Sequence, residues 1–266
     1  MEKDSDARIS VTIITLNEEN NICECLQSLS WADEIVVLDS QSNDRTVELA
    51  RQYTDRVFIE PWSGQGAQKN RAIDLAQGPW IFSIDADERV PPELAREIRD
   101  VVNKASRDAY ALRRKNIYRE QWIRHSGWWP DWVTRLFRKG KACFNDEVIH
   151  DTLVTNGAVG KLKEHLIHHS FEDASSFLER AHRYSAHQAD MMYRNGRRAS
   201  LLIAFSHASF ECLHTYLLRR GFLDGSAGLL IAISNGIGTF YKYMILREKG
   251  LSGVQDPEII KRKSQS

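Results

Sequence analysis

Apolar runs and helical patterns alternate along residues 9–87, and this alternation constrains the fold more than any other feature. Four apolar runs are typical of buried strands: residues 9–14, 34–38, 56–60 and 80–84. Three segments between them have helical periodicity: residues 19–29, 43–53 and 67–76. Strands and helices in this repeating order form parallel βαβ units, so the sequence predicts a mainly parallel sheet.

The rest of the chain follows other patterns. Further expected elements are a helix over 91–102, strands over 110–116 and 132–137, and helices within 173–248. We therefore predict an α/β fold: a Rossmann-like, mainly parallel sheet with a mixed β extension and C-terminal helices. The predicted domain covers residues 1–170, divided into halves 9–105 and 106–170, and a helical region covers residues 171–266.

Two carboxylates, Asp85 and Asp87, follow the last strand of the alternating series. Open α/β sheets bind ligands at the carboxyl ends of their strands. Carboxylate oxygens there can hold Mg²⁺ or Mn²⁺ against the phosphates of a substrate. The alternative is a pair of solvated loop carboxylates, or a helix cap ahead of Pro91.

Two other strand ends carry polar residues that should face the same crevice. Thr15, Asn17 and Glu18 follow the first strand, and the segment Asp39–Thr46 follows the second. Each alone is equally typical of an ordinary strand-to-helix turn. The first strand lacks a Gly-x-Gly-x-x-Gly turn, which disfavours a dinucleotide-binding enzyme.

Together these segments resemble the family 2 inverting glycosyltransferases with the GT-A fold. The resemblance covers about the first 100 residues and is carried by residues 11–19, 36–46, 69–72 and 84–88. The later segments 135–139 and 148–151 resemble bacterial enzymes of lipopolysaccharide core assembly, among them glucosyltransferases that act on an inner-core heptose.

The resemblance implies a set of site residues. The residues expected to bind the nucleotide sugar are Thr15, Asn17, Glu18, Asp39, Lys69 and Asp85. Asp87 is the expected metal ligand, with Asp85 facing either the ribose or the metal. Many family members have a second aspartate after the one matching Asp39, where this chain has Ser40. The identity of the donor's nucleobase is therefore open.

Inversion at an anomeric carbon needs a general base on the acceptor side of the sugar. By resemblance the base is Asp151, with His150 as a neighbour that ligates metal or orients it, and Glu147 and Asp131 are alternatives. A surface hydrogen-bonded pair is the other interpretation of His150 and Asp151. Arg135 is the first candidate to neutralise the departing diphosphate, ahead of Arg138 and Lys69.

Charge is distributed unevenly, although the net charge is zero. The first 100 residues hold 10 of the 36 Lys/Arg and 20 of the 36 Asp/Glu, which leaves 26 basic and 16 acidic residues for the remainder. The acidic part excludes a nucleic-acid groove there. The basic part favours a phosphate-bearing acceptor or an anionic membrane leaflet. This part also contains a cluster of tryptophans: Trp122, Trp128, Trp129 and Trp132. The cluster has three interpretations: a platform for the acceptor sugar, part of the buried core, or an anchor at the membrane interface.

The ends and the cysteines predict the compartment. No secretory signal is visible at the N-terminus, and the four cysteines lack metal-type spacing, which favours a reduced cytoplasmic protein. After Gly221 the uninterrupted apolar run is shorter than the roughly 18 residues of a spanning helix. We therefore predict peripheral attachment to the cytoplasmic face of the inner membrane. The alternative is an ordinary helical cap.

These features lead to one principal hypothesis and two alternatives. The principal hypothesis is a metal-dependent, inverting transfer of a hexose, glucose from UDP-glucose, onto a heptose of the lipopolysaccharide inner core. The first alternative keeps the chemistry and makes a polyprenyl phosphate the acceptor. The second is a catalytically inactive GT-A domain that acts as a membrane scaffold.

Overall fold

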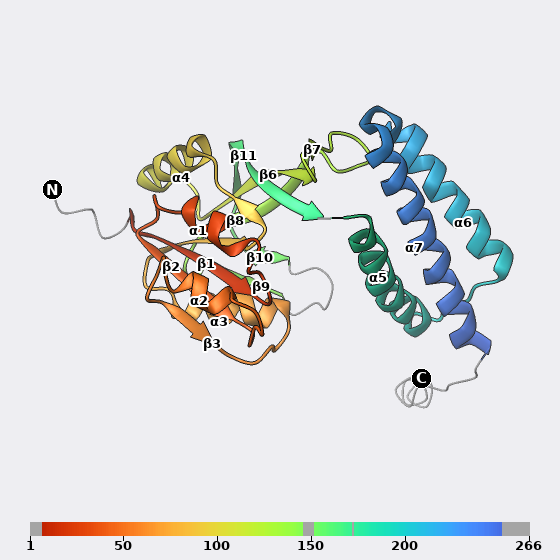
Figure 1. The fold of residues 1–266 in the computed structure, drawn as a ribbon, viewed down its shortest axis with the longest axis horizontal. Helices are drawn as coiled ribbons and strands as arrows, with labels where there is room; N and C mark the ends of the chain where they lie inside the picture. The colour runs from red at the N-terminus through yellow and green to blue at the C-terminus, as the bar shows by residue number, and fades with distance from the viewer. Residues whose placement is uncertain (1–6, 146–151, 172, 252–266) are drawn as a thin grey trace. The chain divides into compact units, whose positions relative to one another are not determined.

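The computed structural model describes residues 7–145, 152–171 and 173–251, and the chain divides into two compact units (Figure 1). Unit 1 comprises residues 1–117 and 130–170. Unit 2 comprises residues 118–129 and 171–266. The tryptophan-containing segment 118–129 thus groups with the C-terminal helices, whereas the sequence analysis assigned it to the first domain.

Strands and helices alternate in the first part of unit 1, in the predicted order. These elements are β1 (Ile9–Thr15), α1 (Ile22–Gln27), β2 (Glu34–Asp39), α2 (Thr46–Ala50), β3 (Val57–Ile59), α3 (Gln65–Leu75), β4 (Trp80–Asp85), β5 (Glu88–Arg89) and α4 (Pro92–Lys104). The later elements are β6 (Ala109–Tyr118), β8 (Asp131–Arg138), β9 (Ala142–Phe144), β10 (Leu153–Thr155) and β11 (Val159–Phe171). The expected fold class, α/β with a mixed β extension and C-terminal helices, is confirmed.

The main sheet of unit 1 has the strand order β3-β2-β1-β4-β8-β6-β11-β5. The first four strands of this order pair in parallel, and β8 joins β4 antiparallel. In the register of β1 and β2, Thr15 lies opposite Asp39, and β1 also pairs Ile14 with Asp85. The three strand ends that the sequence singled out therefore meet at one edge of the sheet.

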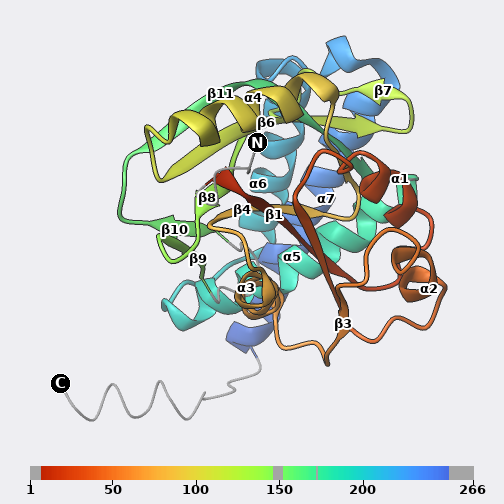
Figure 2. The same ribbon diagram turned by 90° about the vertical axis from the view of Figure 1, so that its left-hand side faces the viewer.

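Helices cover both faces of this sheet. Buried side chains of α1 and α4, such as Leu26 and Ile98, pack in one core cluster with Val11 and Phe82. Ile73 of α3 belongs to a second cluster. Helix α4 lies beside β6 and β11 in Figure 2. Strand interiors that are apolar on both faces are typical of parallel sheets, which explains the continuous apolar runs in the sequence.

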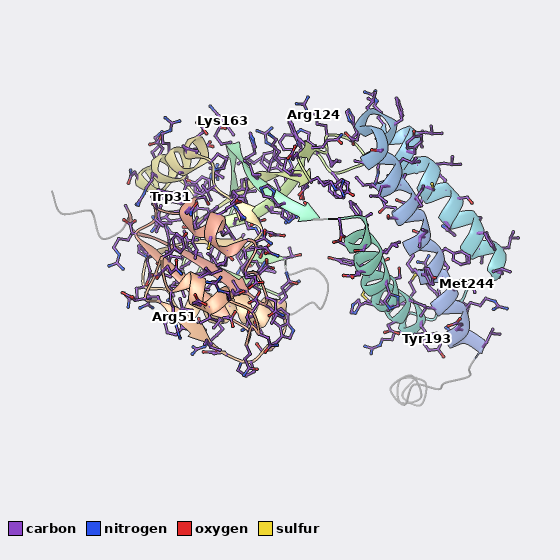
Figure 3. All side chains as sticks on the ribbon, viewed as in Figure 1. Trp31, Arg51, Arg124, Lys163, Tyr193 and Met244 are labelled. Atoms are coloured by element: carbon purple, nitrogen blue, oxygen red, sulfur yellow. The ribbon has the colours of Figure 1, made fainter. Side chains whose placement is uncertain are left out.

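Unit 2 is a helical bundle. Its elements are β7 (Gln121–Trp122), α5 (Ala174–Arg194), α6 (Leu201–Leu213), a π-helical turn η2 (His214–Leu218), a 3₁₀ turn η3 (Gly221–Asp224) and α7 (Gly225–Leu251). Asp173 and Ser200 cap α5 and α6 by accepting backbone N–H groups of the first turn. Tyr193 of α5 and Met244 of α7, both in the C-terminal part of their helix, lie toward the same end of the bundle (Figure 3), so the two helices run in the same direction.

Segment 118–129 belongs to unit 2 because its side chains and backbone are bound there. Ile123 packs in a cluster with Phe177, Ala227 and Ile231. The buried carboxylate of Asp224 accepts hydrogen bonds from the backbone N–H groups of residues 124 and 125. These long-range contacts have no local sequence signal, which is why the sequence analysis missed them.

Two stretches of unit 2 are long and apolar enough to cross a membrane, Leu201–Leu218 and Gly221–Leu251. The sequence analysis found the apolar runs too short, and on length it was wrong. It counted only uninterrupted apolar residues, whereas the helices continue through glycine, serine and histidine, and η2 extends α6 by five residues.

Candidate active site

Thr15 and Asp39 form the centre of the first part of the site. The Thr15 hydroxyl donates a 2.9 Å hydrogen bond to Asp39 Oδ2, and both side chains are buried. Asp39 also accepts from the backbone N–H of Ser42 at 2.8 Å and from its hydroxyl at 2.5 Å. Asp39 therefore fixes the loop that follows β2 against the end of β1.

The loop after β1 is held to the loop after β2 by its own backbone. Asn17 has a positive φ of 56°, which asparagine tolerates better than most residues. Its N–H donates to Ser42 Oγ, and its side-chain oxygen accepts from Asn43 N–H at 2.9 Å. The N–H of Glu18 donates to Thr46 Oγ1 at 2.7 Å. The predicted donor-side residues of both loops are thus brought together.

Asp85 is clamped between two buried cations. Lys69 Nζ lies 2.8 Å from Asp85 Oδ1, and Arg135 lies 2.5 Å from Oδ2. Burial raises the pKa of Asp85, but Arg135 and Lys69 outweigh it and hold the pKa well below its usual range. Asp85 is therefore ionised, and its charge is neutralised by the protein itself.

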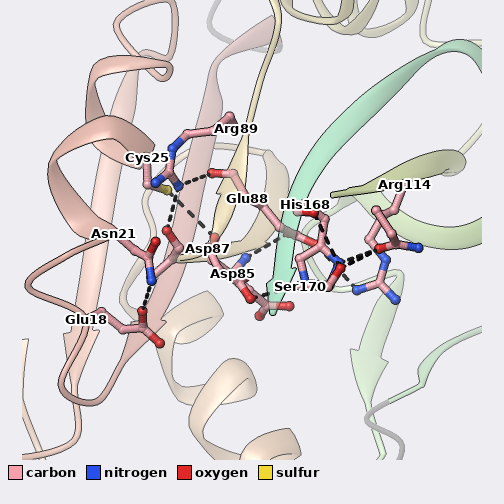
Figure 4. A network of polar contacts seen from close by, with 12 residues as sticks. Glu18, Asn21, Cys25, Asp85, Asp87, Glu88, Arg89, Arg114, His168 and Ser170 are labelled. Atoms are coloured by element: carbon pink, nitrogen blue, oxygen red, sulfur yellow. Dashed lines mark hydrogen bonds and ion pairs between the residues drawn. The ribbon is translucent and has the colours of Figure 1, made fainter. Parts of the chain in front are cut away.

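The clamp continues through Glu88, which is fully buried. Arg135 contacts Glu88 Oε1 at 3.0 Å, and Glu88 Oε2 accepts the N–H of Asp85 at 2.9 Å. Arg114 contacts both Glu88 and Asp131, at 3.5 and 2.9 Å. Arg135 and Asp131, which the sequence proposed for diphosphate and base, are thus both members of one ion-pair network. Figure 4 shows Asp85, Glu88 and Arg114 of this region.

Asp87 differs from Asp85 because it faces a histidine. His168 Nε2 of β11 lies 3.2 Å from Asp87 Oδ2, and the other ring nitrogen contacts Asn116 at 2.6 Å and Ser170 at 3.0 Å. The second oxygen, Asp87 Oδ1, is buried and has no hydrogen-bond partner among the described residues. A buried, unsatisfied carboxylate oxygen is costly unless a ligand completes it.

The donor set fits a divalent cation. Asp87 Oδ1 offers a hard oxygen, and His168 is oriented through its second nitrogen by Asn116, as metal-binding histidines usually are. Within the described residues no group of three or more His, Cys, Asp or Glu side chains surrounds a common point. The metal-binding role expected of Asp87 therefore stays a prediction.

The candidate base Asp151, its neighbour His150 and the alternative Glu147 lie outside the described residues. The residues on either side of this segment are described. Asn145 N–H donates to Thr152 O at 3.1 Å, and Thr152 N–H donates to Asn145 Oδ1 at 2.9 Å. Asn70 of α3 holds Phe144 by two backbone hydrogen bonds, each 2.8 Å.

Sequence reasoning missed four residues of this site: Glu88, Arg114, Asn116 and His168. His168 reaches Asp87 because β11 pairs with β5, opposite Glu88, although 81 residues separate the two in the chain. The one available signal was the high polar content of an otherwise apolar strand.

Comparison with known proteins agrees with this geometry. Residues 10–161 match the family described as Glycosyl transferase family 2. A glycosyltransferase of Rickettsia conorii, named as uncharacterized, is 29% identical and covers 94% of both chains. The lipopolysaccharide core biosynthesis glycosyltransferase LpsC of Rhizobium meliloti is 30% identical over 87% of this chain and 89% of its own. The crystal structure of S. aureus TarS 1–349 in complex with UDP is 15% identical, covers 92% of each chain and has a TM-score of 0.49.

Proposed function

The chain belongs to glycosyl transferase family 2 and is a glycosyltransferase, and from this premise we propose that it transfers a hexose from a UDP-sugar to the lipopolysaccharide inner core. The proposed donor is UDP-glucose and the proposed acceptor position is a heptose. The observation that carries the proposal is the buried Asp87 oxygen, which has no hydrogen-bond partner in the part of the chain that the structure describes. It lies beside His168, at the edge of the sheet where Thr15 and Asp39 meet.

We propose that Asp87 and His168 hold Mg²⁺ or Mn²⁺ on the donor diphosphate. The bound ion would supply positive charge to the departing UDP. Asp85 has a different role, because its carboxylate is already neutralised by Lys69 and Arg135. Its proposed role is to position these two cations beside the diphosphate.

The proposed binding side for the nucleoside comprises the loops after β1 and β2. Asn17 and Glu18 lie beside Thr15, and the loop after β2 is pinned by Asp39 and Ser42. A crevice fixed by short hydrogen bonds loses little conformational entropy when a nucleotide binds. Rigid donor loops of this kind favour one orientation of the sugar relative to the acceptor.

The proposed base is Asp151, assisted by His150. Inverting transfer requires one carboxylate to remove the proton of the attacking hydroxyl while UDP leaves from the opposite side. Glu147 remains an alternative. Asp131 is less suitable, because Arg114 and Asn116 already bind its Oδ2, and a base in an ion pair binds a proton weakly.

The proposed acceptor class is supported by a relative and by charge. LpsC, at 30% identity, carries the name of a lipopolysaccharide core enzyme. The remainder of the chain after residue 100 is basic, which suits a phosphate-bearing acceptor at an anionic surface. We accordingly propose a cytoplasmic location with attachment to the inner membrane.

The test measures UDP release from UDP-glucose with Mn²⁺, using truncated lipopolysaccharide cores and a polyprenyl phosphate as alternative acceptors. We expect turnover with a heptose-bearing core, and a loss of about 100-fold or more in Asp87→Asn. The matched control is Asp100→Asn, an exposed aspartate of α4, which should retain wild-type turnover. Turnover with polyprenyl phosphate alone would show that the acceptor is a polyprenyl phosphate and not the lipopolysaccharide core. If no donor and acceptor gave turnover, the inactive membrane scaffold would be the remaining hypothesis.

A further inference from the structure

Unit 2 contains a long stretch with very few charged residues. Between Arg198 and Lys242 the charged side chains are Glu211, Arg219, Arg220 and Asp224. Glu211 is half-buried and accepts a hydrogen bond from Thr215, and Asp224 is buried. The two arginines are exposed, and they lie at the turn between α6 and α7. The outward surfaces of α6 and α7 are therefore uncharged between their ends.

Large apolar side chains cover these outward surfaces. On α6 and η2 the exposed residues are Leu201, Leu202, Ile203, Phe205, Phe210, Leu213, Leu217 and Leu218. On η3 and α7 they are Phe222, Leu223, Leu229, Ile233, Ile237 and Tyr241. Only 11% of the first apolar stretch and 28% of the second are buried. A core helix of a soluble protein would be mostly buried, so these helices need another apolar environment.

Basic side chains flank this apolar face. Arg197 and Arg198 are exposed just before α6, and Arg219 and Arg220 are exposed at its other end. Lys242 and Arg247 come after the exposed apolar residues of α7 in the sequence. An apolar face bordered by cations at both ends matches the interface of an anionic leaflet, where lipid phosphates border the acyl chains. A second copy of the chain would bring like charges together.

The connections of the bundle disfavour a crossing of the bilayer. The turn between α6 and α7 is bound to segment 118–129, because Asp224 accepts from residues 124–126. Phe177, at the start of α5, packs in the same cluster as Ile123. The chain enters unit 2 at Tyr118, leaves after Trp129 and returns at Phe171. Within unit 2, segment 118–129 and the start of α5 thus lie at the end of the bundle that contains this turn.

Helix α5 would have to cross together with α6 and α7. It packs along the length of α7, with Ser185 donating to Gly238 O at 2.7 Å and Asp190 pairing with Lys249 at 2.6 Å. Yet α5 has charged residues throughout, including Glu179, Asp190 and Arg194, and such a helix is costly in a bilayer. The bundle is therefore suited to lie in the plane of the membrane.

We infer that α6, η2 and α7 embed their shared exposed face in one anionic leaflet, parallel to the membrane and without crossing it. This inference rests on the proposed membrane attachment and deepens it, and it is independent of the proposed transfer reaction. The occupant of the face is lipid, with acyl chains against the leucines and phenylalanines, and anionic headgroups against Arg197, Arg198, Arg219 and Arg220.

The first test is flotation of the purified full chain with vesicles of phosphatidylcholine containing phosphatidylglycerol. We expect binding that weakens about tenfold in Leu202→Glu and in Leu213→Glu, because each variant places a charge on the embedded face. The matched control is Leu178→Glu, at a leucine of α5 in the same unit that is exposed to a similar degree as Leu213, and this variant should bind like wild type. The inference would be overturned if the wild-type chain did not bind the vesicles, or if all three variants bound them as wild type does.

The second test separates embedding from crossing. A cysteine is placed at Asn195, in the exposed connection between α5 and α6, in a chain whose Cys23, Cys143 and Cys212 are changed to serine. The embedded arrangement predicts labelling by an impermeant maleimide in inverted membrane vesicles and none in intact spheroplasts. Labelling from the outside would show that the helices cross.

The remaining outcomes also have a defined meaning. Light scattering without lipid reports a second copy on the face: a dimer that Leu202→Glu dissociates, with no vesicle binding, would overturn the inference. UDP release with a soluble acceptor fragment should be unchanged in Leu202→Glu, since this residue lies outside the site. For the wild-type chain, UDP release without vesicle binding would refute the embedding alone, and vesicle binding without UDP release would refute the proposed function alone.

Discussion

Unit 1 buries charge, whereas unit 2 exposes apolar surface. In unit 1 the side chains of Lys69, Glu88 and Arg135 are almost completely enclosed, and each forms a buried ion pair: Lys69 with Asp85, and Arg135 with Glu88. In unit 2 leucines such as Leu202 and Leu218 are more than 70% exposed. Both arrangements are costly for an isolated domain in water. The difference fits the two proposals above, in which the nucleotide-sugar donor is the partner of unit 1 and a lipid surface is the partner of unit 2.

The largest effect should come from breaking the buried network of unit 1. Arg135→Met leaves Glu88 and Asp85 short of a cation, and we expect a loss of about 3–5 kcal/mol in the free energy of unfolding. Urea unfolding measures it. The matched control is Arg96→Met, whose exposed pair with Glu93 should contribute less than about 1 kcal/mol. Equal effects of the two changes would mean that burial of the network is unimportant.

A smaller effect is expected for the buried carboxylate of unit 2. Asp224→Ala leaves the backbone N–H groups of residues 124 and 125 without their acceptor, at a cost of about 2–4 kcal/mol. Limited proteolysis within 118–129 would report the release of this segment. Asp190→Ala, which removes only the exposed pair with Lys249, should leave the segment protected. Rapid cleavage in both variants would contradict the proposed role of Asp224.

The third effect concerns metal affinity rather than stability. His168→Asn should raise the Mn²⁺ concentration needed for half-maximal UDP release by about 10–100-fold, with little change in folding. His165→Asn, a second histidine of β11, is the control and should keep the wild-type titration. An unchanged Mn²⁺ dependence in His168→Asn would remove this residue from the proposed coordination.

The smallest effect should come from the exposed face of unit 2 in water. Leu202→Glu should change the free energy of unfolding by less than about 0.5 kcal/mol without lipid, because the side chain is exposed. Leu26→Ala, at a fully buried leucine of α1, should cost about 2–5 kcal/mol in the same assay. A large loss in Leu202→Glu would indicate that the face is covered by protein.

The sequence predicted the parts of this structure that depend on local patterns. Alternating apolar runs located β1, β2, β3 and β4, and their order placed Thr15, Asp39 and Asp85 at one edge of the sheet. Periodicity also located α3 and α4 to within a few residues. These predictions succeed because a buried parallel strand needs a continuous apolar run, which the chain displays directly.

The unpredicted parts depend on pairing between distant segments. Nothing near His168 indicates that β11 pairs with β5 and brings the histidine to Asp87. Likewise, the sequence offered Lys69 and Arg135 as cations for a diphosphate, and only the structure shows that Asp85 binds both. Register across a mixed sheet is set by long-range packing, which a single sequence does not encode in a readable pattern.

Two consecutive residues of α3 reach different segments of the site. Lys69 binds Asp85, and Asn70 binds both backbone groups of Phe144, as a neighbouring strand would. Because one rigid helix carries both contacts, the β9 segment that leads toward the proposed base cannot shift without straining the ion pair beside the donor diphosphate. Helix α3 is thus a rigid spacer between Asp85 at the end of β4 and Phe144 of β9.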